Sequence, residues 1–322
     1  MGAFSRRYNP MTDLPDLHGK VIIVTGASSG VGKYTALHLA RKGAKIYLAC
    51  RNERKTLAVI KELQKEGLGP GNGTLHYIHL NLSDLESVKK SAEEFLARES
   101  RLDVLINNAG YSEEAYVTTR YGLGEDIVAN FLGPFLFTKI LLPLLKSTAK
   151  ETGSDVRILN VSSEAHRFAS GSIAVYTSRE ALSNKVSDSR IGKSKRYGYT
   201  KLANILHINE LQRRLSEEGV PITCISLHPG AIATPAVQNW VSYMLPFGKA
   251  IARLVFMAQE DGAITSAFAA GGTEIKLDVE RYKGVYLVPF GKIGKKSKEA
   301  NDPQKAVDLW NTAEKILKEL NV

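Results

Sequence analysis

The sequence predicts a doubly wound α/β fold, a three-layer sandwich in which helices cover both faces of a mostly parallel sheet of about seven strands. Two observations predict it. Short apolar, β-rich runs alternate with longer helical patterns, and a repeated strand–helix–strand order implies parallel pairing through right-handed crossovers. Several of the runs are also nearly continuous in apolar residues, which is typical of strands that are buried on both faces.

The strand-like segments follow one another through most of the chain. They cover residues 20–26, 45–50, 74–80, 102–108, 156–162, 222–228 and 284–290. The first, second, fourth and fifth are the nearly continuous apolar runs. Helical stretches such as 32–43 and 53–67 separate them.

Three segments depart from this alternation. Residues 1–17 contain two prolines and are expected to form an extended N-terminal arm. Residues 18–322 are expected to form a single catalytic domain. Within it, the polar residues 164–195 form an insertion before the next helix, and loops of this length are usually functional or disordered. Residues 235–270 are expected to be amphipathic helices that cover a substrate site.

Composition limits the classes of function. The formal net charge is +10, but the basic residues are spread along the chain rather than clustered with aromatics, so we expect no nucleic-acid partner. The alternatives are a solvated basic surface, or attraction to an anionic cofactor or an anionic membrane. The seven histidines show no ligand spacing, so no metal site is expected. The two cysteines, Cys50 and Cys224, exclude a disulfide framework and read as buried hydrophobes.

No N-terminal stretch resembles a signal peptide. The longest apolar runs are broken by proline, glycine or lysine, and we expect them to fall short of the ~18 apolar residues that a spanning helix needs. The sequence therefore favours a cytoplasmic protein, with peripheral contact to a membrane or lipid droplet as an alternative.

A glycine-rich turn joins the first strand to the first helix. Gly26, Gly30 and Gly32 have the spacing G-x-x-x-G-x-G. Such glycines allow a tight turn, close approach of the backbone to a pyrophosphate, and close helix–sheet packing. The helix that follows presents unpaired N–H groups and the positive end of its dipole, so the sequence predicts a dinucleotide site.

The end of the second strand distinguishes between dinucleotides. Sites for NAD carry a carboxylate there, which binds the ribose 2′-hydroxyl. This chain has Cys50 at that position, followed by Arg51. A guanidinium can hold a 2′-phosphate through two hydrogen bonds, so the sequence predicts NADP(H) as cofactor.

Six motifs in order give the chain a resemblance to the classical short-chain dehydrogenase/reductase family, whose fold is the Rossmann type. They are "TGASSGVG" (25–32), "NNAG" (107–110), Asn130 in "IVANFLGPF", Ser163 in "NVSSEAH", "YGYTK" (197–201) and "HPGAIAT" (228–234). Details such as "ACRN" and "TKLAN" resemble the branch that contains retinol dehydrogenases and their fungal relatives.

The resemblance implies a catalytic set. Tyr197 would be the general acid or base, and Lys201, one helical turn away, would lower its pKa from the ordinary value near 10 and hold the nicotinamide ribose. Ser163 would bind the substrate oxygen as its negative charge develops. Its neighbour Ser162 is the rival, but successive strand side chains face opposite ways, so only one serves the site. Asn130 would kink its helix around a water that passes protons to Lys201.

The resemblance also implies a set of cofactor contacts. They are Gly26, Ser28, Ser29, Gly30, Val31, Gly32, Arg51, Asn81, Leu82, Asn108, Ala109, Gly110, Tyr197, Lys201, Pro229, Gly230, Ile232 and Thr234. One departure is Asn81, which stands where many members have an aspartate that binds the adenine amino group. Its amide oxygen is expected to accept that hydrogen bond more weakly. The other departure is the long segment between Ser163 and Tyr197, which is expected to form a wall of the substrate site.

These features predict an NADP(H)-dependent enzyme that interconverts a lipophilic aldehyde or ketone with an alcohol by hydride transfer. The lipophilic substrate is inferred from apolar residues that follow Thr234. Two alternatives stay open: a reductase of carbon–carbon double bonds, and a cofactor-binding regulatory protein with little turnover. A homo-oligomer also stays open, because members of the family are often dimers or tetramers.

Overall fold

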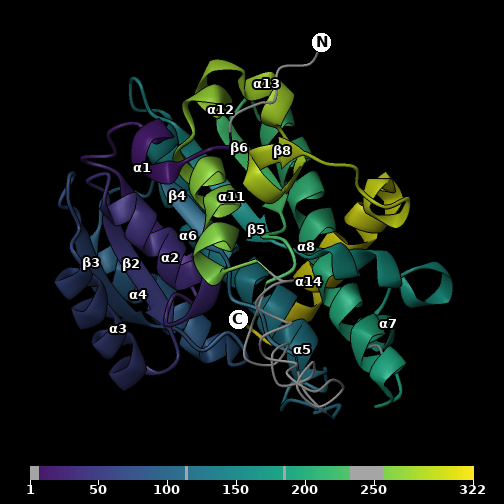
Figure 1. Cartoon of the computed structure of the whole chain (residues 1–322). Helices are drawn as coiled ribbons and strands as arrows, with labels where there is room; N and C mark the ends of the chain where they lie inside the picture. Colours follow the sequence, from purple (N-terminus) through teal and green to yellow (C-terminus); the bar gives the residue numbers. More distant parts are fainter. Residues whose placement is uncertain (1–6, 113–114, 184–185, 233–256) are drawn as a thin grey trace, which may run out of the picture.

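The computed structural model describes residues 7–112, 115–183, 186–232 and 257–322, which form a three-layer α/β sandwich (Figure 1). The sheet in the middle has the strand order β3-β2-β1-β4-β5-β6-β7-β8. Its strands are β1 (Val21–Thr25), β2 (Lys45–Cys50), β3 (Thr74–His79), β4 (Val104–Asn107), β5 (Val156–Val161), β6 (Ile222–Leu227), β7 (Tyr286–Val288) and β8 (Lys292–Ile293). The predicted doubly wound fold is confirmed.

The sheet has one strand more than the sequence predicts. β1 to β7 pair in parallel and correspond to the seven predicted segments. β8 pairs antiparallel with β7, with Leu287 opposite Ile293. It has only two residues, both exposed, so it produces no alternating pattern that a sequence analysis could detect.

Helices cover both faces of the sheet. On one face lie α2 (Gly30–Ala40), α3 (Glu53–Glu66) and α11 (Gln259–Gly271). On the other lie α4 (Leu85–Arg98), α6 (Gly133–Ala149), α8 (Arg190–Glu217) and α14 (Pro303–Glu319). Shorter elements are α1 (Pro10–Asp13), α5 (Glu125–Ile127), α7 (Arg179–Ser183), α12 (Thr273–Leu277), α13 (Val279–Tyr282), the π-helix η1 (Val128–Leu132), and the 3₁₀-helices η2 (Glu164–Phe168), η3 (Gly171–Ile173), η4 (Pro289–Gly291) and η5 (Glu299–Asn301).

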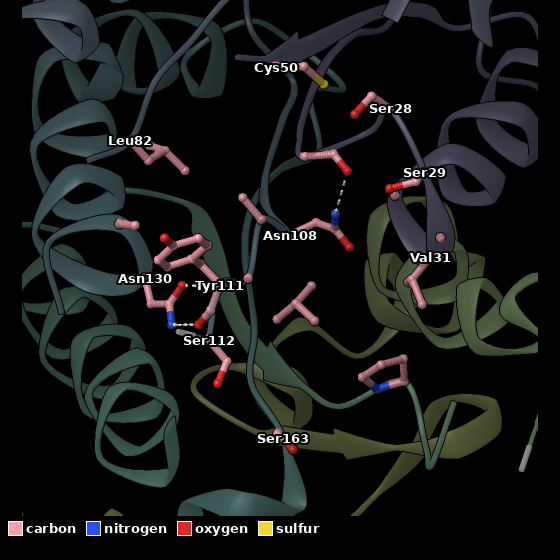
Figure 2. Close-up of a pocket in the computed structure, with 18 of the residues that line it drawn as sticks. Ser28, Ser29, Val31, Cys50, Leu82, Asn108, Tyr111, Ser112, Asn130 and Ser163 are labelled. Atoms are coloured by element: carbon pink, nitrogen blue, oxygen red, sulfur yellow. Dashed lines mark hydrogen bonds between the residues drawn. The ribbon is translucent and has the colours of Figure 1, made fainter. Parts of the chain in front are cut away.

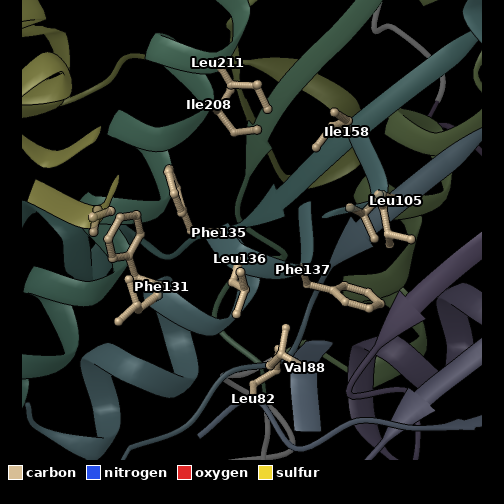
Figure 3. Packing of buried hydrophobic residues seen from close by; sticks show 14 of the residues in the cluster. Leu82, Val88, Leu105, Phe131, Phe135, Leu136, Phe137, Ile158, Ile208 and Leu211 are labelled. Carbon is tan, nitrogen blue, oxygen red and sulfur yellow. The ribbon is translucent and has the colours of Figure 1, made fainter. Parts of the chain in front are cut away.

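The two faces of the sheet bury separate apolar cores. Along β1, Val21 and Ile23 join one core, whereas Ile22 and Val24 join the other. This explains why β1 is continuously apolar, since both of its faces are covered. Figure 3 shows the core beneath α6, where Phe131, Phe135 and Phe137 are buried.

The strand order creates a crevice at one edge of the sheet. From β1 the chain proceeds outward to β2 and β3, and it then returns to β4 and continues in the opposite direction. The loops after β1 and β4 therefore diverge to opposite faces. In open parallel sheets, ligands bind at this switch point, outside the carboxyl ends of the strands.

The N-terminal segment differs from the extended arm that the sequence predicts. Asn9 accepts a hydrogen bond from the Met11 N–H and caps the short helix α1. Leu14 and Leu17 follow the helix, and both are buried in the core beside α11. The segment is thus packed against the domain, and one turn of it is helical.

The insertion 164–195 is divided into η2, η3 and α7, and helix α8 begins at Arg190, inside the predicted boundary. The early start of α8 is explained by its N-cap residue Ser189, whose hydroxyl accepts from the Gly192 N–H at 3.1 Å. The buried Tyr176 anchors the segment. It donates to the Tyr199 carbonyl at 2.9 Å and stacks on the Tyr199 ring, with the centroids 4.5 Å apart.

The apolar runs are interrupted as expected, but one helical stretch, Glu125–Ala149, still meets a test of length and mean hydropathy for a membrane span. The stretch is long enough because the helix continues through Pro143. However, 67% of its most apolar window is buried inside the protein, as in the core helix of a soluble domain. The sequence also predicts helices at 235–270 that cover a substrate site. Residues 235–256 of this segment lie outside the described part of the chain.

Candidate active site

A cleft of about 1020 Å³ lies along the carboxyl edge of the sheet, at the switch point (Figure 2). Loops after β1, β2, β4, β5 and β6 form its wall. The predicted site residues that line it are Gly26, Ser28, Ser29, Gly30, Val31, Gly32, Arg51, Asn81, Leu82, Asn108, Ala109, Gly110, Asn130, Ser163, Tyr197, Lys201, Pro229, Gly230 and Ile232. The remaining one, Thr234, lies outside the described residues.

The glycine turn after β1 packs directly on the loop after β4. The Thr25 hydroxyl accepts from the backbone N–H groups of Asn108 and Ala109, both at 3.0 Å, and the Asn108 amide donates to the Thr25 carbonyl at 2.8 Å. A Cβ on Gly32 would lie 2.4 Å from the Asn108 Nδ2 atom, and a Cβ on Gly26 would lie 2.8 Å from the Ala109 Cα atom. Glycine is therefore required where the two motifs meet.

The N-terminus of α2 opens into the cleft. Its N-cap, Ser29, makes no side-chain hydrogen bond to the first turn. No acidic residue lies in that turn. The free N–H groups and the positive end of the helix dipole therefore face the cleft wall formed by Ser29, Gly30 and Val31, which suits a phosphate group.

The other end of the cleft carries two basic side chains. Arg51 follows β2, and Lys55 lies in the first turn of α3; both are exposed and both line the cleft. Asn52 fixes their spacing, because its side chain caps α3 by accepting from the Lys55 N–H at 2.9 Å. Lys55 was not identified from the sequence. Its position could have been inferred from its spacing of four residues from Arg51, which places both side chains near the N-terminus of α3.

Asn81 lines the cleft, but its side chain is engaged within its own turn. Its Oδ1 atom accepts from the Ser83 backbone N–H at 3.3 Å and from the Ser83 hydroxyl at 3.0 Å. This oxygen is thus already satisfied, which weakens the expectation that it binds an adenine amino group. Nearby Asp84 caps α4 and pairs with Arg120, so it is also engaged.

The two neighbouring serines after β5 face opposite ways, as expected from the strand geometry. Ser162 is buried and donates to the Lys201 carbonyl at 2.7 Å, so it joins β5 to α8. Ser163 lines the cleft and is half-buried. Its hydroxyl oxygen accepts from the Ala165 N–H at 3.1 Å. Ser163 is therefore the serine that can contact a ligand.

Tyr197 and Lys201 lie one turn apart on α8, and both face the cleft. The Lys201 Nζ atom is 5.6 Å from the centroid of the Tyr197 ring and donates to the Val161 carbonyl at 2.9 Å. Lys201 is 2% exposed, and this burial lowers its pKa to about 8. Its ammonium form is therefore the main one at neutral pH, but only by about a tenfold margin.

The pKa of Tyr197 differs from the expectation. Burial raises it above the ordinary value of a tyrosine, and a hydrogen bond between Tyr197 and Ser163 opposes part of that rise. Lys201 donates to a backbone carbonyl of β5, and it does not produce the expected lowering in this structure. At neutral pH the phenol therefore holds its proton, which is the state required of an acid.

Asn130 lies in an irregular part of its helix. This part is the π-helix η1, a geometry that is common at functional sites. Its Oδ1 atom accepts from the Tyr111 N–H at 2.8 Å, and its Nδ2 atom donates to the Tyr111 carbonyl at 2.7 Å and to the Thr200 hydroxyl at 3.0 Å. Asn130 thus ties the loop after β4 to helix α8, and Figure 2 shows its paired bonds with Tyr111.

Several further residues line the cleft without having been predicted. Besides Lys55, they include Tyr111, Ser112, Glu125, Lys193, Ser194 and Gln259. Tyr111 and Ser112 directly follow the "NNAG" motif, so their position was accessible from the sequence. Nothing in the sequence marks Lys193 and Ser194, which reach the cleft because α8 begins before the predicted boundary.

Comparisons with known proteins agree with this geometry. A family model described as short chain dehydrogenase matches residues 20–185, a range that includes the glycine turn and Ser163 and ends before Tyr197. A short-chain dehydrogenase/reductase of Armillaria gallica is 43% identical over 98% of this chain and 98% of its own length. Dehydrogenase/reductase SDR family member 13 of Bos taurus is 34% identical and covers 95% of this chain and 75% of its own.

Among solved structures, an uncharacterized protein of Mycobacterium paratuberculosis has a similar fold. Its TM-score is 0.70 at 29% identity, and the match covers 97% of this chain and 98% of that one. The similarity in sequence and in structure therefore extends through nearly the whole chain.

Proposed function

Because the chain belongs to the short-chain dehydrogenase/reductase family, we propose that it is an NADP(H)-dependent oxidoreductase that interconverts a carbonyl compound and an alcohol. The observation that carries this proposal is the meeting of Ser163, Tyr197 and Lys201 in the cleft that also contains the glycine turn. A cofactor-binding protein without turnover would not need this acid–base set.

The residues present fit a phosphorylated dinucleotide. The free N–H groups of α2 suit the pyrophosphate. Gly32 packs closely on Asn108 and has no side chain, so a ligand can approach the backbone of the turn where it lines the cleft. Arg51 and Lys55 at the far end suit a 2′-phosphate, since both are cations without a competing carboxylate at the end of β2. NADP(H) would supply or accept the hydride.

The side chains at the other end suit a carbonyl group. Ser163 would hold the carbonyl oxygen, and Tyr197, protonated at neutral pH, would donate its proton to that oxygen during reduction. Lys201, whose Nζ atom lies 5.6 Å from the centroid of the phenol ring, would hold the nicotinamide ribose, as the family resemblance implies. Alcohol oxidation would use the same groups in reverse.

A lipophilic substrate is the part of this proposal that rests on sequence alone. The apolar residues that favour it, among them Trp240 and Phe247, lie outside the described part of the chain. The described wall near Ser163 also contains the polar residues Ser112, Lys193 and Ser194. We therefore propose a carbonyl compound with an apolar body and a polar end near the catalytic serine.

Substitution of Tyr197 by phenylalanine tests the proposal. Tyr197→Phe removes one oxygen from the cleft and should lower kcat by roughly 10²- to 10⁴-fold with NADPH and a panel of aldehydes and ketones. The matched control is Tyr77→Phe on β3, which removes the same oxygen outside the cleft and should leave kcat unchanged. Near-normal turnover of Tyr197→Phe would refute the assignment of the acid.

A further inference from the structure

A buried histidine connects the catalytic serine to the C-terminal part of the chain. His166 lies three residues after Ser163, in η2, and is 0% exposed. Its Nδ1 atom lies 2.7 Å from the Ser163 carbonyl oxygen, and its Nε2 atom lies 3.2 Å from the Ser297 backbone nitrogen. Each ring nitrogen thus has one backbone partner.

The two partners together determine the state of the ring. The Ser297 N–H can only donate, so Nε2 must be the acceptor and carries no proton. The proton is then on Nδ1, from which it is donated to the Ser163 carbonyl. Burial also lowers the pKa of His166, so the ring is neutral at pH 7. Ser297 therefore selects the one tautomer that can bind the backbone of Ser163.

The segment around Ser297 is itself fixed to the domain. The Lys295 carbonyl accepts from Arg167 at 2.6 Å, and Lys296 donates to the Asn209 side chain at 2.6 Å and to the Gly284 carbonyl at 2.5 Å. Lys296 is thus held between α8 and the start of β7, and its burial among uncharged partners lowers its pKa to about 8. Three consecutive residues, 295 to 297, provide a rigid support.

We propose that His166 is a positioning residue for the catalytic serine: it transmits the support of residues 295–297 to the Ser163 backbone and so fixes the direction of the Ser163 hydroxyl. This inference rests on the proposed role of Ser163 in carbonyl reduction. The Ser163 hydroxyl oxygen accepts from the Ala165 N–H, so the direction of the hydroxyl depends on the geometry of this turn. Small displacements of a catalytic group cost large factors in rate.

Three substitutions of His166 distinguish a role in positioning Ser163 from a purely structural role in packing. His166→Asn places an amide N–H near the position of Nδ1 and keeps the donor to Ser163, whereas His166→Gln places its amide near Nε2 and loses that donor. His166→Ala loses both bonds. We expect kcat to fall by roughly tenfold or more in His166→Ala and His166→Gln, and by clearly less in His166→Asn, while the Kd for NADPH stays within about twofold.

The matched control is His38→Gln, in an equally buried histidine on α2 whose ring does not contact Ser163. It should lower the thermal midpoint without lowering kcat, which shows that general destabilisation does not mimic the effect. Wild-type kcat in His166→Ala, or equal kcat in His166→Asn and His166→Gln, would overturn the inference. If Tyr197→Phe keeps its turnover, the proposed function fails, whatever the His166 variants do.

Discussion

The glycine turn after β1 and the catalytic segment after β5 line the same cleft, yet they are held in different ways. The turn is fixed by the loop after β4, and both partners carry motifs: Thr25 and Gly32 on one side, Asn108 on the other. The catalytic segment is fixed by partners that lie outside the motifs, Ser297 and Asp188. His166 depends on Ser297, and Arg196, which precedes Tyr197, depends on Asp188.

Under the proposed function, cofactor binding and chemistry would therefore be supported by separate parts of this chain. The first support consists of backbone contacts at the centre of the sheet. The second consists of side-chain bonds that cross the insertion and reach the segment 295–297. Substitutions in the first should therefore affect cofactor affinity, and substitutions in the second should affect kcat and local stability.

Gly32→Ala should have the largest effect. The new Cβ would lie 2.4 Å from the Asn108 Nδ2 atom and 2.8 Å from the Gly26 carbonyl oxygen, so the Asn108 side chain and the backbone of the glycine turn must both shift. An overpacking cost of about 1–3 kcal/mol, if it falls on the bound state, corresponds to roughly a 5- to 150-fold rise in the Kd for NADPH, measured by fluorescence titration. Gly69→Ala is the matched control, since its Cβ would meet only the Asn72 Oδ1 atom, at 3.8 Å, and Gly69 does not line the cleft. Unchanged affinity in Gly32→Ala would contradict the role of the contact.

Arg51→Asp should have a smaller effect, confined to the phosphorylated cofactor. A carboxylate after β2 repels a 2′-phosphate and can accept from a ribose hydroxyl, so the ratio of kcat/KM for NADPH to that for NADH should fall by at least about tenfold. Arg54→Asp makes the same charge change on α3 at a position that does not line the cleft, and it should alter the ratio little. A wild-type enzyme that prefers NADH would remove the basis of this prediction.

Arg196→Gln should leave cofactor affinity nearly unchanged and act on stability instead. Arg196 is 3% exposed and donates to the Val186 and Ser187 carbonyls at 3.1 and 3.0 Å and to Asp188 at 2.8 Å, with Asp126 3.6 Å away. Its loss should lower the free energy of unfolding by about 3 kcal/mol, measured in urea. Arg98→Gln, which breaks an exposed pair on α4, is the control and should cost less than about 1 kcal/mol. A rise in the Kd for NADPH as large as that of Gly32→Ala would contradict the separation of the two supports.

Much of the fold could be predicted from the sequence because its signals are local. The alternation of apolar runs and helical patterns identified β1 to β7, and continuous burial explains why β1 and β5 are mostly apolar, although β5 also buries Arg157 and Asn160. β8 was missed because two exposed residues carry no periodicity. The early start of α8 was missed because the Ser189 cap follows a serine-rich stretch in which several residues could serve equally well.

The site was predictable to the extent that motifs mark it. Ser163 was preferred to Ser162 because the second serine matches the family's catalytic position, and strand geometry implied that only one of the two serves the site. In the structure Ser163 is half-buried at the cleft, whereas the Ser162 hydroxyl is buried and bonded to α8. The engagement of Asn81 by Ser83 and the raised pKa of Tyr197 were not accessible, since both depend on burial and on partners in space. For the same reason, no sequence pattern connects His166 with Ser297.

The double connection between β5 and Lys201 has a consequence for how such enzymes diversify. The Lys201 carbonyl accepts from Ser162 and its ammonium donates to the Val161 carbonyl, so one residue is attached to the strand end through both its backbone and its side chain. The end of the cleft that holds Tyr197, the proposed proton donor, is thus anchored to the sheet through Lys201. Exchanging the substrate wall between homologous chains should therefore change which molecules are accepted while the proton chemistry is inherited intact.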